Sequence, residues 1–329
     1  MEVQAYLNGI LPRSNNTLEL GSSWLKGRTS REEFEKVLRK ETIGLIELQQ
    51  NLGFDYIIDG QLFWGDFLRP IAKALELHRP NSNADENPVT RQIYTNTFYR
   101  KPLITSRLKN SKEIIDCRFI ERIKGKRKII LPSPFAFIYL SDGIHRNENG
   151  KIKNEIFKEL LVDFARILNF EIKRLEKDCN VSFVQFNEPC LAYAEETDYF
   201  WNNITYSLED ATKGIKSVTS LHIHNGDASK FLPKLLELPV ERIGVDAYLT
   251  NIRKFADVKF TKFLEAGVIN SKNSFVEDAR VIAKYASQII ERIKPDRLAL
   301  VPNRPLELVP QQIAVKKIES LAQALKLLK

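Results

Sequence analysis

Two of the four histidines in this chain lie two residues apart, at His222 and His224. Residues i and i+2 of a β-strand point to the same side, so a strand here directs both imidazoles at one point. Asp246 ends the next apolar run and adds a carboxylate. These nitrogen and oxygen ligands favour zinc or another divalent ion, with one coordination position left open for catalysis. The alternative is that one histidine forms a hydrogen bond in the interior and the other packs under an inserted segment.

Polar residues close other apolar runs as well. Asn187 and Glu188 end one run, and Arg304 follows another. Pro189 cannot continue a strand ladder, so the carboxylate of Glu188 is a candidate general acid or base at a strand end. The guanidinium of Arg304 is a candidate partner for a carboxylate. A helix cap or a turn is the alternative role for any one of these residues.

Aromatic side chains form a further group of candidates. Four of them follow apolar runs, where they can stack on a flat heterocycle: Phe63, Trp64, Phe200 and Trp201. Packing in the core is the alternative for each of them.

Short β-like runs alternate with longer amphipathic helical patterns, which is typical of βα units around a parallel sheet. Eight runs are expected, at about residues 3–10, 56–60, 128–132, 181–187, 220–225, 242–247, 260–269 and 297–302. Helical patterns include residues 30–51, 151–177, 208–216, 228–236, 274–293 and 310–328. Eight units, with no GxGxxG fingerprint, favour an α/β fold of the (β/α)8 TIM-barrel type over a doubly wound sheet. The candidate residues would then meet at the carboxyl ends of the strands.

The segment 77–121 breaks this alternation. It contains a stretch rich in Pro, Asn, Ser and Asp, followed by a β-like run at residues 91–101. We interpret it as an insertion between the second and third strands, either a hairpin or a lid. The prediction is therefore one TIM-barrel domain over residues 1–329 that carries this insertion.

Composition restricts the class of protein. The chain has 329 residues, of which 43% are hydrophobic, and no apolar stretch approaches the roughly 20 residues of a membrane span. The start of the chain lacks the features of a signal peptide, so we expect a soluble cytoplasmic protein without a membrane partner. The net charge of +8 is dispersed. It favours an anionic small substrate or an acidic protein over nucleic acid. The three cysteines, Cys117, Cys179 and Cys190, are expected to be buried reduced thiols.

Several motifs resemble those of one family, the cobalamin-independent methionine synthases, whose chains pair two (β/α)8 barrels. Residues 9–14 are similar to its G-[FY]-P-R opening, and residues 53–60 to its G-[IF]-D-x-[IL]-x-x-G stretch. Residues 94–102 are similar to T-N-x-x-Y-x-x-P, and residues 131–135 to G-P-[FV]-T-F. The most specific likeness is that of residues 185–189, Q-F-N-E-P, to Q-I-D-E-P.

The resemblance also implies what has changed in this chain. In the family's catalytic barrel, zinc is held by the histidine and cysteine of H-x-C, by a glutamate and by a second cysteine. His222 matches the histidine, whereas His224 replaces the first cysteine, Asp246 the glutamate and Arg304 the second cysteine. Asn187 replaces the aspartate that would hold the amine of homocysteine. A cation at position 304 repels a dication, so the family's zinc site is not expected, and a weaker His222, His224 and Asp246 site is left open.

The resemblance implies a single barrel similar to the amino-terminal, non-zinc half of the family. Such a barrel would bind methyltetrahydrofolate or its acidic polyglutamate tail, and a separate zinc-bearing barrel would complete methyl transfer to homocysteine. The expected catalytic residues are Asn187 and Glu188, and the expected substrate-binding residues are Arg13, Trp64, Asn96 and Arg304. One alternative is a self-sufficient methyltransferase that uses the altered metal site on another thiol or methyl donor. Another is a protein of the uroporphyrinogen decarboxylase branch of the same superfamily.

Overall fold

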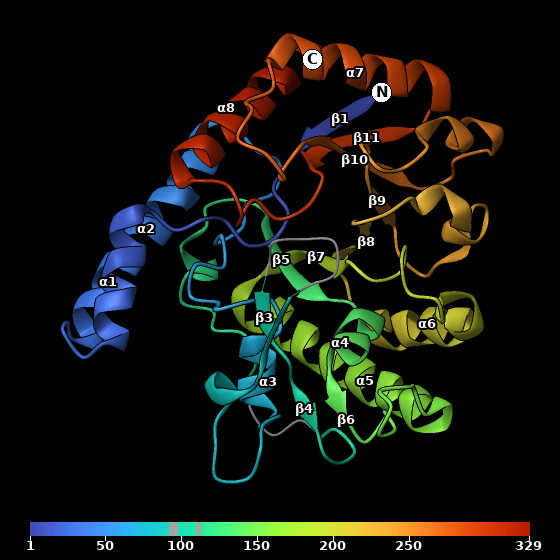
Figure 1. Ribbon diagram of the computed structural model, residues 1–329. Coiled ribbons are helices and arrows are strands. Elements are labelled where there is room, and N and C mark those ends of the chain that lie inside the picture. The colour runs from blue at the N-terminus through green and yellow to red at the C-terminus, as the bar shows by residue number, and fades with distance from the viewer. Residues whose placement is uncertain (92–97, 110–112) are drawn as a thin grey trace.

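The computed structural model describes residues 1–91, 98–109 and 113–329. Its centre is a seven-stranded parallel sheet in the order β1-β11-β10-β9-β8-β7-β5, which curls round on itself (Figure 1). The strands are β1 (Glu2–Ala5), β5 (Arg127–Pro132), β7 (Val181–Glu188), β8 (Val218–Ile223), β9 (Arg242–Asp246), β10 (Phe263–Ile269) and β11 (Arg297–Pro302). Sequential neighbours pair in register from β7 to β11, as a barrel of βα units requires.

The second predicted strand is reduced to a short extended segment that lies between β1 and β5. The backbone N–H of Asp55 donates to the carbonyl of Ala5 at 3.1 Å. On the other side, the N–H of Ile57 donates to the carbonyl of Lys126 at 3.0 Å, and that of Lys128 donates to the carbonyl of Ile57 at 2.9 Å. All eight predicted runs therefore take their places in the circle, and the TIM-barrel prediction is confirmed.

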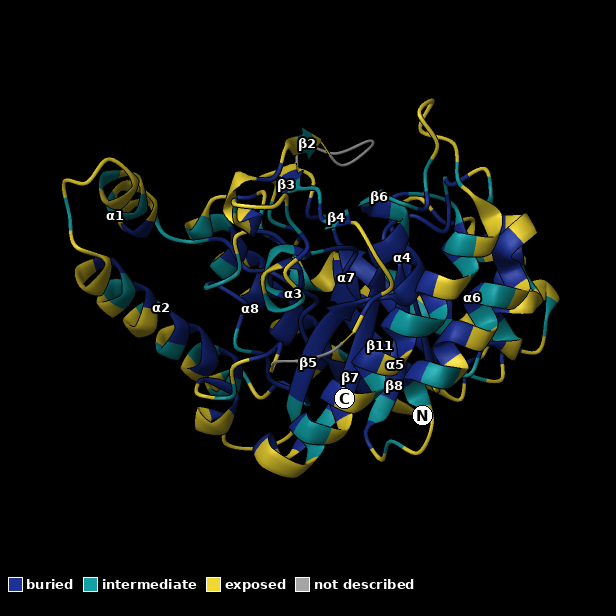
Figure 2. Ribbon diagram, turned by 90° about the horizontal axis from the view of Figure 1, so that it is seen from below, coloured by how far each residue is buried: buried dark blue, intermediate teal, exposed yellow. Residues whose placement is uncertain are grey.

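Helices surround this sheet. They are α1 (Asn15–Leu25), α2 (Arg31–Asn51), α3 (Arg69–Ala74), α4 (Pro134–Leu140), α5 (Asn154–Cys179), α6 (Thr197–Thr212), α7 (Ala279–Ile293) and α8 (Gln311–Leu328). Short 3-10 helices are η1 (Ala84–Glu86), η2 (Ile120–Arg122), η3 (Ala228–Phe231), η4 (Lys234–Glu237) and η5 (Ile252–Asp257). Figure 2 shows buried strands and a largely exposed α1 that projects from the barrel together with the start of α2. No helix within the described residues is long and apolar enough to cross a membrane.

Local sequence explains where several of these elements begin and end. Ser30 caps α2 by accepting a hydrogen bond from the backbone N–H of Glu33 at 3.1 Å, as the capping pattern predicts. The helix expected at residues 228–236 is instead two short 3-10 helices, η3 and η4. Pro233 stands between them and has no N–H to continue a helical ladder, which explains the difference.

Part of the segment 77–121 forms an antiparallel pair of strands. β2 (Val89–Arg91) pairs with β3 (Phe98–Arg100), while β4 (Leu103–Ile104) pairs with β6 (Asp142–Gly143). The end of the segment rests on α5, because the backbone N–H groups of Ile114 and Ile115 donate to Glu171 Oε1 at 3.2 and 2.7 Å. Its role as a lid and the single-domain extent of the chain stay predictions.

The expectation of three reduced cysteines is wrong for two of them. Cys117 and Cys179 form a disulfide with their Cα atoms 5.9 Å apart, and Cys190 is free and buried. Cys117 belongs to the inserted segment and Cys179 ends α5, 62 residues later. Their contact depends on how the insertion docks against the helix, which cysteine spacing does not reveal.

Candidate active-site pocket

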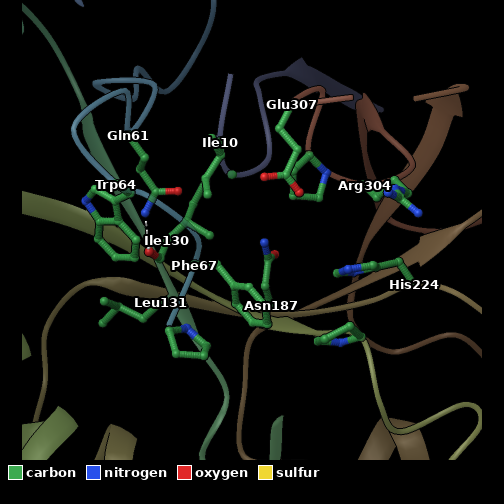
Figure 3. Close-up of a pocket in the computed structure, with 14 residues that line it drawn as sticks. Ile10, Gln61, Trp64, Phe67, Ile130, Leu131, Asn187, His224, Arg304 and Glu307 are labelled. Carbon is green, nitrogen blue, oxygen red and sulfur yellow. Dashed lines mark hydrogen bonds between the residues drawn. The ribbon is translucent and has the colours of Figure 1, made fainter. Parts of the chain in front are cut away.

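A pocket opens at the carboxyl ends of the strands and encloses about 450 Å³, including its open mouth. Figure 3 shows Trp64 and Gln61 on one side, His224 and Arg304 on the other, and Asn187 between them. The complete lining is Gly9, Ile10, Gln61, Trp64, Phe67, Ile130, Leu131, Pro132, Asn187, Pro189, His224, Arg304, Pro305 and Glu307. Apart from Gln61, whose side-chain amide donates to the carbonyl of Ile130 at 2.9 Å, one side is thus apolar and aromatic, and the other carries the polar groups.

The polar side brings three of the predicted residues together, namely Asn187, His224 and Arg304. The amide oxygen of Asn187 accepts a hydrogen bond from Gln185 Nε2 at 2.6 Å. Because that oxygen is engaged, the Asn187 amide offers a ligand chiefly its N–H donors. Arg304 is almost fully buried and donates to the side-chain oxygen of Asn225 at 3.2 Å.

Burial determines the charges on this side of the pocket. It lowers the pKa of Arg304, although the Glu307 and Asp246 carboxylates act in the opposite direction. Burial, together with neighbouring His222 and Arg304, holds the pKa of His224 well below its ordinary value, so this imidazole is neutral. Among the described residues, no group donates to or accepts from His224 Nδ1. An anionic ligand would therefore meet a buried guanidinium beside a neutral imidazole.

His222 faces the barrel interior below the pocket and does not line it. Its Nε2–H donates to the backbone carbonyl of Asn303 at 2.9 Å, and its Nδ1 lies 3.6 Å from Glu265 Oε2. The side-chain amide nitrogen of Asn8 also lies 3.4 Å from Nδ1 and 3.3 Å from Nε2, so protein groups surround both ring nitrogens, with Glu265 supplied by β10.

Asp246 is also engaged by the protein. Its Oδ1 accepts hydrogen bonds from the backbone N–H groups of Tyr248 at 3.0 Å and Leu249 at 3.3 Å. Its Oδ2 accepts one from Asn303 Nδ2 at 3.1 Å. The carboxylate thus caps the turn after β9, and burial raises its pKa.

These placements do not fit a zinc ion. Over the described part of the chain, no group of three or more His, Cys, Asp and Glu side chains is arranged to hold a metal. His222 Nε2 is protonated towards a carbonyl, and both Asp246 oxygens accept hydrogen bonds. Arg304 adds a buried cation to the same region. The expected His222, His224 and Asp246 ligand set is thus not assembled, and we derive no metal chemistry from it.

Glu188 points away from the pocket wall, because adjacent residues of a strand face opposite sides. Its Oε1 accepts hydrogen bonds from the backbone N–H groups of Cys190 at 2.8 Å and Leu191 at 2.9 Å. Its Oε2 accepts one from Ser133 Oγ, the cap of α4. Burial raises the pKa of Glu188 to about 7, although these hydrogen bonds lower it in part. Through these hydrogen bonds, Glu188 connects the loop after β5, at Ser133, with the loop after β7, at Cys190 and Leu191.

Arg13 does not line the pocket, but it contacts the backbone of the segment that carries Trp64. Its guanidinium donates to the backbone carbonyl of Leu62 at 2.8 and 2.6 Å and to that of Trp64 at 2.9 Å. Of the four aromatic candidates, Trp64 lines the pocket, while the other three pack elsewhere: Phe63, Phe200 and Trp201. Asn96 lies outside the described residues.

A buried charged network forms the barrel interior, and the sequence analysis did not identify it. Lys128 Nζ donates to the carbonyl of Leu7 at 3.0 Å and lies 4.0 Å from the ring centre of Tyr6. Glu265 Oε1 accepts from Tyr6 Oη at 2.8 Å, and Arg242 donates to the same hydroxyl at 2.9 Å. Burial lowers the pKa of Lys128 to about 7. The available signal was Glu265 inside an apolar strand, with Lys128 and Arg242 at the starts of two others.

Comparisons with known proteins agree with this architecture. The family described as "Cobalamin-independent synthase, N-terminal domain" matches residues 66–294, which is more than half of the chain. A methionine synthase of Saccharolobus islandicus is 25% identical over 310 residues, covering 92% of this chain and 88% of that protein. One of Sulfolobus acidocaldarius is 23% identical over 299 residues, covering 89% and 82%.

Solved structures show the same fold. A B12-independent methionine synthase of a Shewanella species, in complex with selenomethionine, superposes with a TM-score of 0.77 at 18% identity. That comparison covers 99% of this chain and 96% of the other. A putative vitamin-B12-independent methionine synthase of Listeria monocytogenes gives 0.67 at 15% identity, with 100% and 99% covered. With its barrel, its motifs and the match over residues 66–294, the chain belongs to the cobalamin-independent methionine synthase family, in the class of its N-terminal domain.

Proposed function

We propose that this chain binds methyltetrahydrofolate in the pocket and acts with a separate zinc-bearing barrel in methyl transfer to homocysteine. The observation that supports the proposal most is the buried Arg304 guanidinium opposite an aromatic wall, at a site that does not fit a metal. A folate-type ligand carries a flat ring system at one end and one or more carboxylates at the other. The two sides of the pocket complement these two ends.

The charges favour a carboxylate at Arg304. Burial lowers the pKa of the Arg304 guanidinium, and a ligand carboxylate would stabilise its charged form through paired hydrogen bonds. Asn187 would add an amide donor to the same anion. Opposite them, Trp64 and Phe67 offer flat apolar surfaces for a ring.

The metal misfit supports a division of labour between two polypeptides. In methyl transfer to homocysteine, zinc supplies activation of the thiol as a thiolate. His222 and Asp246 are occupied by hydrogen bonds to Asn303, which leaves this chain the tasks of binding and orienting the methyl donor. We therefore assign zinc to the partner barrel and folate binding to this one.

Calorimetric titration of methyltetrahydrofolate, with one or three glutamates, into the purified chain tests the binding role. Arg304→Gln should weaken binding at least about tenfold, because a charged hydrogen bond is worth roughly 1.5–3 kcal/mol. Arg297→Gln is the matched control, since Arg297 is exposed at the opposite end of the same strand and should leave binding unchanged. Equal affinity of wild type and Arg304→Gln would contradict the proposal.

Activity measurements test the partnership. The chain alone should not transfer a methyl group from methyltetrahydrofolate to homocysteine, and transfer should require an added zinc-bearing barrel. The alternative of a self-sufficient methyltransferase predicts stoichiometric zinc that is lost in His222→Ala, together with activity of the chain alone. That result would replace the proposal.

A further inference from the structure

Four hydrogen bonds hold Asn303, the buried residue that directly follows β11. Its backbone N–H donates to the carbonyl of Ile269 at 2.8 Å, and its backbone carbonyl accepts from His222 Nε2 at 2.9 Å. In the side chain, Oδ1 accepts from the backbone N–H of Ser271 at 2.9 Å, and Nδ2 donates to Asp246 Oδ2 at 3.1 Å. These bonds tie one residue to β8, to β9 and to the end of β10 at the same time.

Close packing against β10 adds to these hydrogen bonds. A Cβ atom at Gly267 would lie 2.5 Å from the Cα of Asn303, a separation that a side chain does not tolerate. Glycine at this position therefore lets the end of β11 approach β10. One residue further along, the carbonyl of Arg304 accepts a hydrogen bond from Ser271 Oγ at 2.7 Å. The backbone at residues 303 and 304 is thus held by both packing and hydrogen bonds.

The side chain of Arg304 begins at this fixed backbone. At its other end, Nη1 donates to Asn225 Oδ1 at 3.2 Å. Asn225 has a left-handed backbone, with φ at +68°, which asparagine adopts more readily than most residues. The guanidinium is therefore held at both ends, by the backbone bonded through Asn303 and by the amide of Asn225. A shift of the backbone would carry the guanidinium with it, and hydrogen bonds to a ligand weaken steeply when their geometry changes.

We propose that Asn303 is the residue that positions the Arg304 guanidinium in the pocket. Asn303 does not line the pocket, so it acts through the arginine and not by contact with a ligand. His222 and Asp246, which the sequence analysis considered as metal ligands, are the side chains that hold the positioning residue. The inference rests on the proposed function for the identity of the ligand alone, since the placement of Arg304 is a property of the chain itself.

Exchange of two side chains tests this role. Asn303→Asp sets two carboxylates against each other at the contact with Asp246, and Asp246→Asn sets two amide donors against each other. Each single variant should weaken methyltetrahydrofolate binding at least about tenfold in calorimetry. The double variant Asn303→Asp/Asp246→Asn reverses the direction of the hydrogen bond at the same net charge. It keeps an oxygen for the N–H groups of Ser271 and Tyr248, and its affinity should return to within about threefold of wild type.

The Asp246→Asn variant separates positioning from simple electrostatics. The Asp246 carboxylate is a negative charge near Arg304, so its removal alone should strengthen the binding of an anion. Positioning by Asn303 predicts the opposite sign. Asn273→Asp is the matched control, because this exposed side chain keeps its hydrogen bond from the backbone N–H of Phe275 when the amide becomes a carboxylate. The control should bind within about twofold of wild type.

NMR of the arginine guanidinium groups measures the placement of Arg304 without any ligand. The signals, assigned by their loss in Arg304→Gln, should show separate Nη nitrogens in the wild type and the double variant and averaged ones in each single variant. Asp246→Asn retains Asn303 and keeps the test valid if Asn303→Asp does not fold. Equal or tighter binding in Asp246→Asn, no recovery in the double variant, or unchanged guanidinium signals would overturn the inference. A wild-type chain that does not bind methyltetrahydrofolate would end the proposed function, while the ligand-free signals would still decide the role of Asn303.

Discussion

Replacement of Glu188 by Gln isolates the cost of one buried carboxylate. In the folded chain, Glu188 Oε1 accepts two backbone hydrogen bonds, and Oε2 faces the hydroxyl of Ser133. A glutamine keeps both backbone donors on its oxygen and directs its amide N–H at Ser133 Oγ. The substitution therefore removes the charge while the hydrogen-bonded loops at residues 133 and 188–191 are retained.

The effect on stability depends on pH in a defined direction. Burial raises the pKa of Glu188 from 4.5 to about 7, so the folded chain keeps a proton that the unfolded chain releases near 4.5. Between these values the folded state binds more protons, and the free energy of unfolding falls as the pH rises. At about 1.4 kcal/mol per unit, the full difference is about 3 kcal/mol. Glu188→Gln should match wild type near pH 4.5 and exceed it by up to this amount above pH 7.

Guanidinium denaturation of both proteins between pH 4.5 and 8 measures this difference. Glu195→Gln, an exposed carboxylate in the following loop, is the control and should keep the wild-type pH dependence. A Glu188→Gln variant with the wild-type dependence would refute the buried environment assigned to Glu188. Loss of methyl transfer at unchanged ligand affinity would instead support the general acid or base role that the sequence predicts.

Three further outcomes are expected. Arg13→Ala should weaken methyltetrahydrofolate binding about tenfold by calorimetry, because the hydrogen bonds from Arg13 to the backbone of Leu62 and Trp64 are lost. Arg13→Lys should restore only part of the affinity. Unchanged affinity in Arg13→Ala would contradict the role of Arg13 in positioning Trp64. Asn187→Asp should weaken the binding of methyltetrahydrofolate with three glutamates more than that with one glutamate, since the new carboxylate repels the ligand's carboxylates. Dialysis against a chelator should leave the dissociation constant for methyltetrahydrofolate unchanged. A loss of binding that added zinc restores would contradict the assignment of zinc to the partner barrel.

The barrel was predictable because alternation of strand and helix leaves a periodic trace in the sequence. Most units contribute an apolar run and an amphipathic helix, whereas β8 and β9 are followed only by short 3-10 helices, and the eight apolar runs identify the fold. The second predicted strand shows where this prediction is least accurate. Residues 55–57 carry β-like residues, but the turn that follows at Gly60 and Gln61, both with positive φ, ends the pairing after a single bridge.

The candidate site was predictable only to the level of strand ends. Asn187 and Glu188 are adjacent in the sequence, and the strand sends one into the pocket and the other away from it. Neither composition nor spacing states which of the two faces inward, because that depends on the register of β7 between its neighbours. The same applies to His222, in β8, and His224, directly after it: the first lies in the barrel interior and the second lines the pocket.

The interior network lay beyond the reach of strand periodicity. Glu265 interrupts an apolar strand, whereas Lys128 and Arg242 lie at the amino-terminal ends of β5 and β9, where a charge is also compatible with an exposed position. Their mutual compensation, with Tyr6 between Arg242 and Glu265, requires the barrel to bring Tyr6, directly after β1, together with β5, β9 and β10. These charged residues therefore contact one another only once the barrel has closed.

The most direct test of the account is a crystal structure of the chain with methyltetrahydrofolate, grown with zinc present. The account predicts a ligand carboxylate about 3 Å from the Arg304 guanidinium and no metal between His222, His224 and Asp246. A zinc ion bound by those three side chains, with the folate placed away from Arg304, would contradict it.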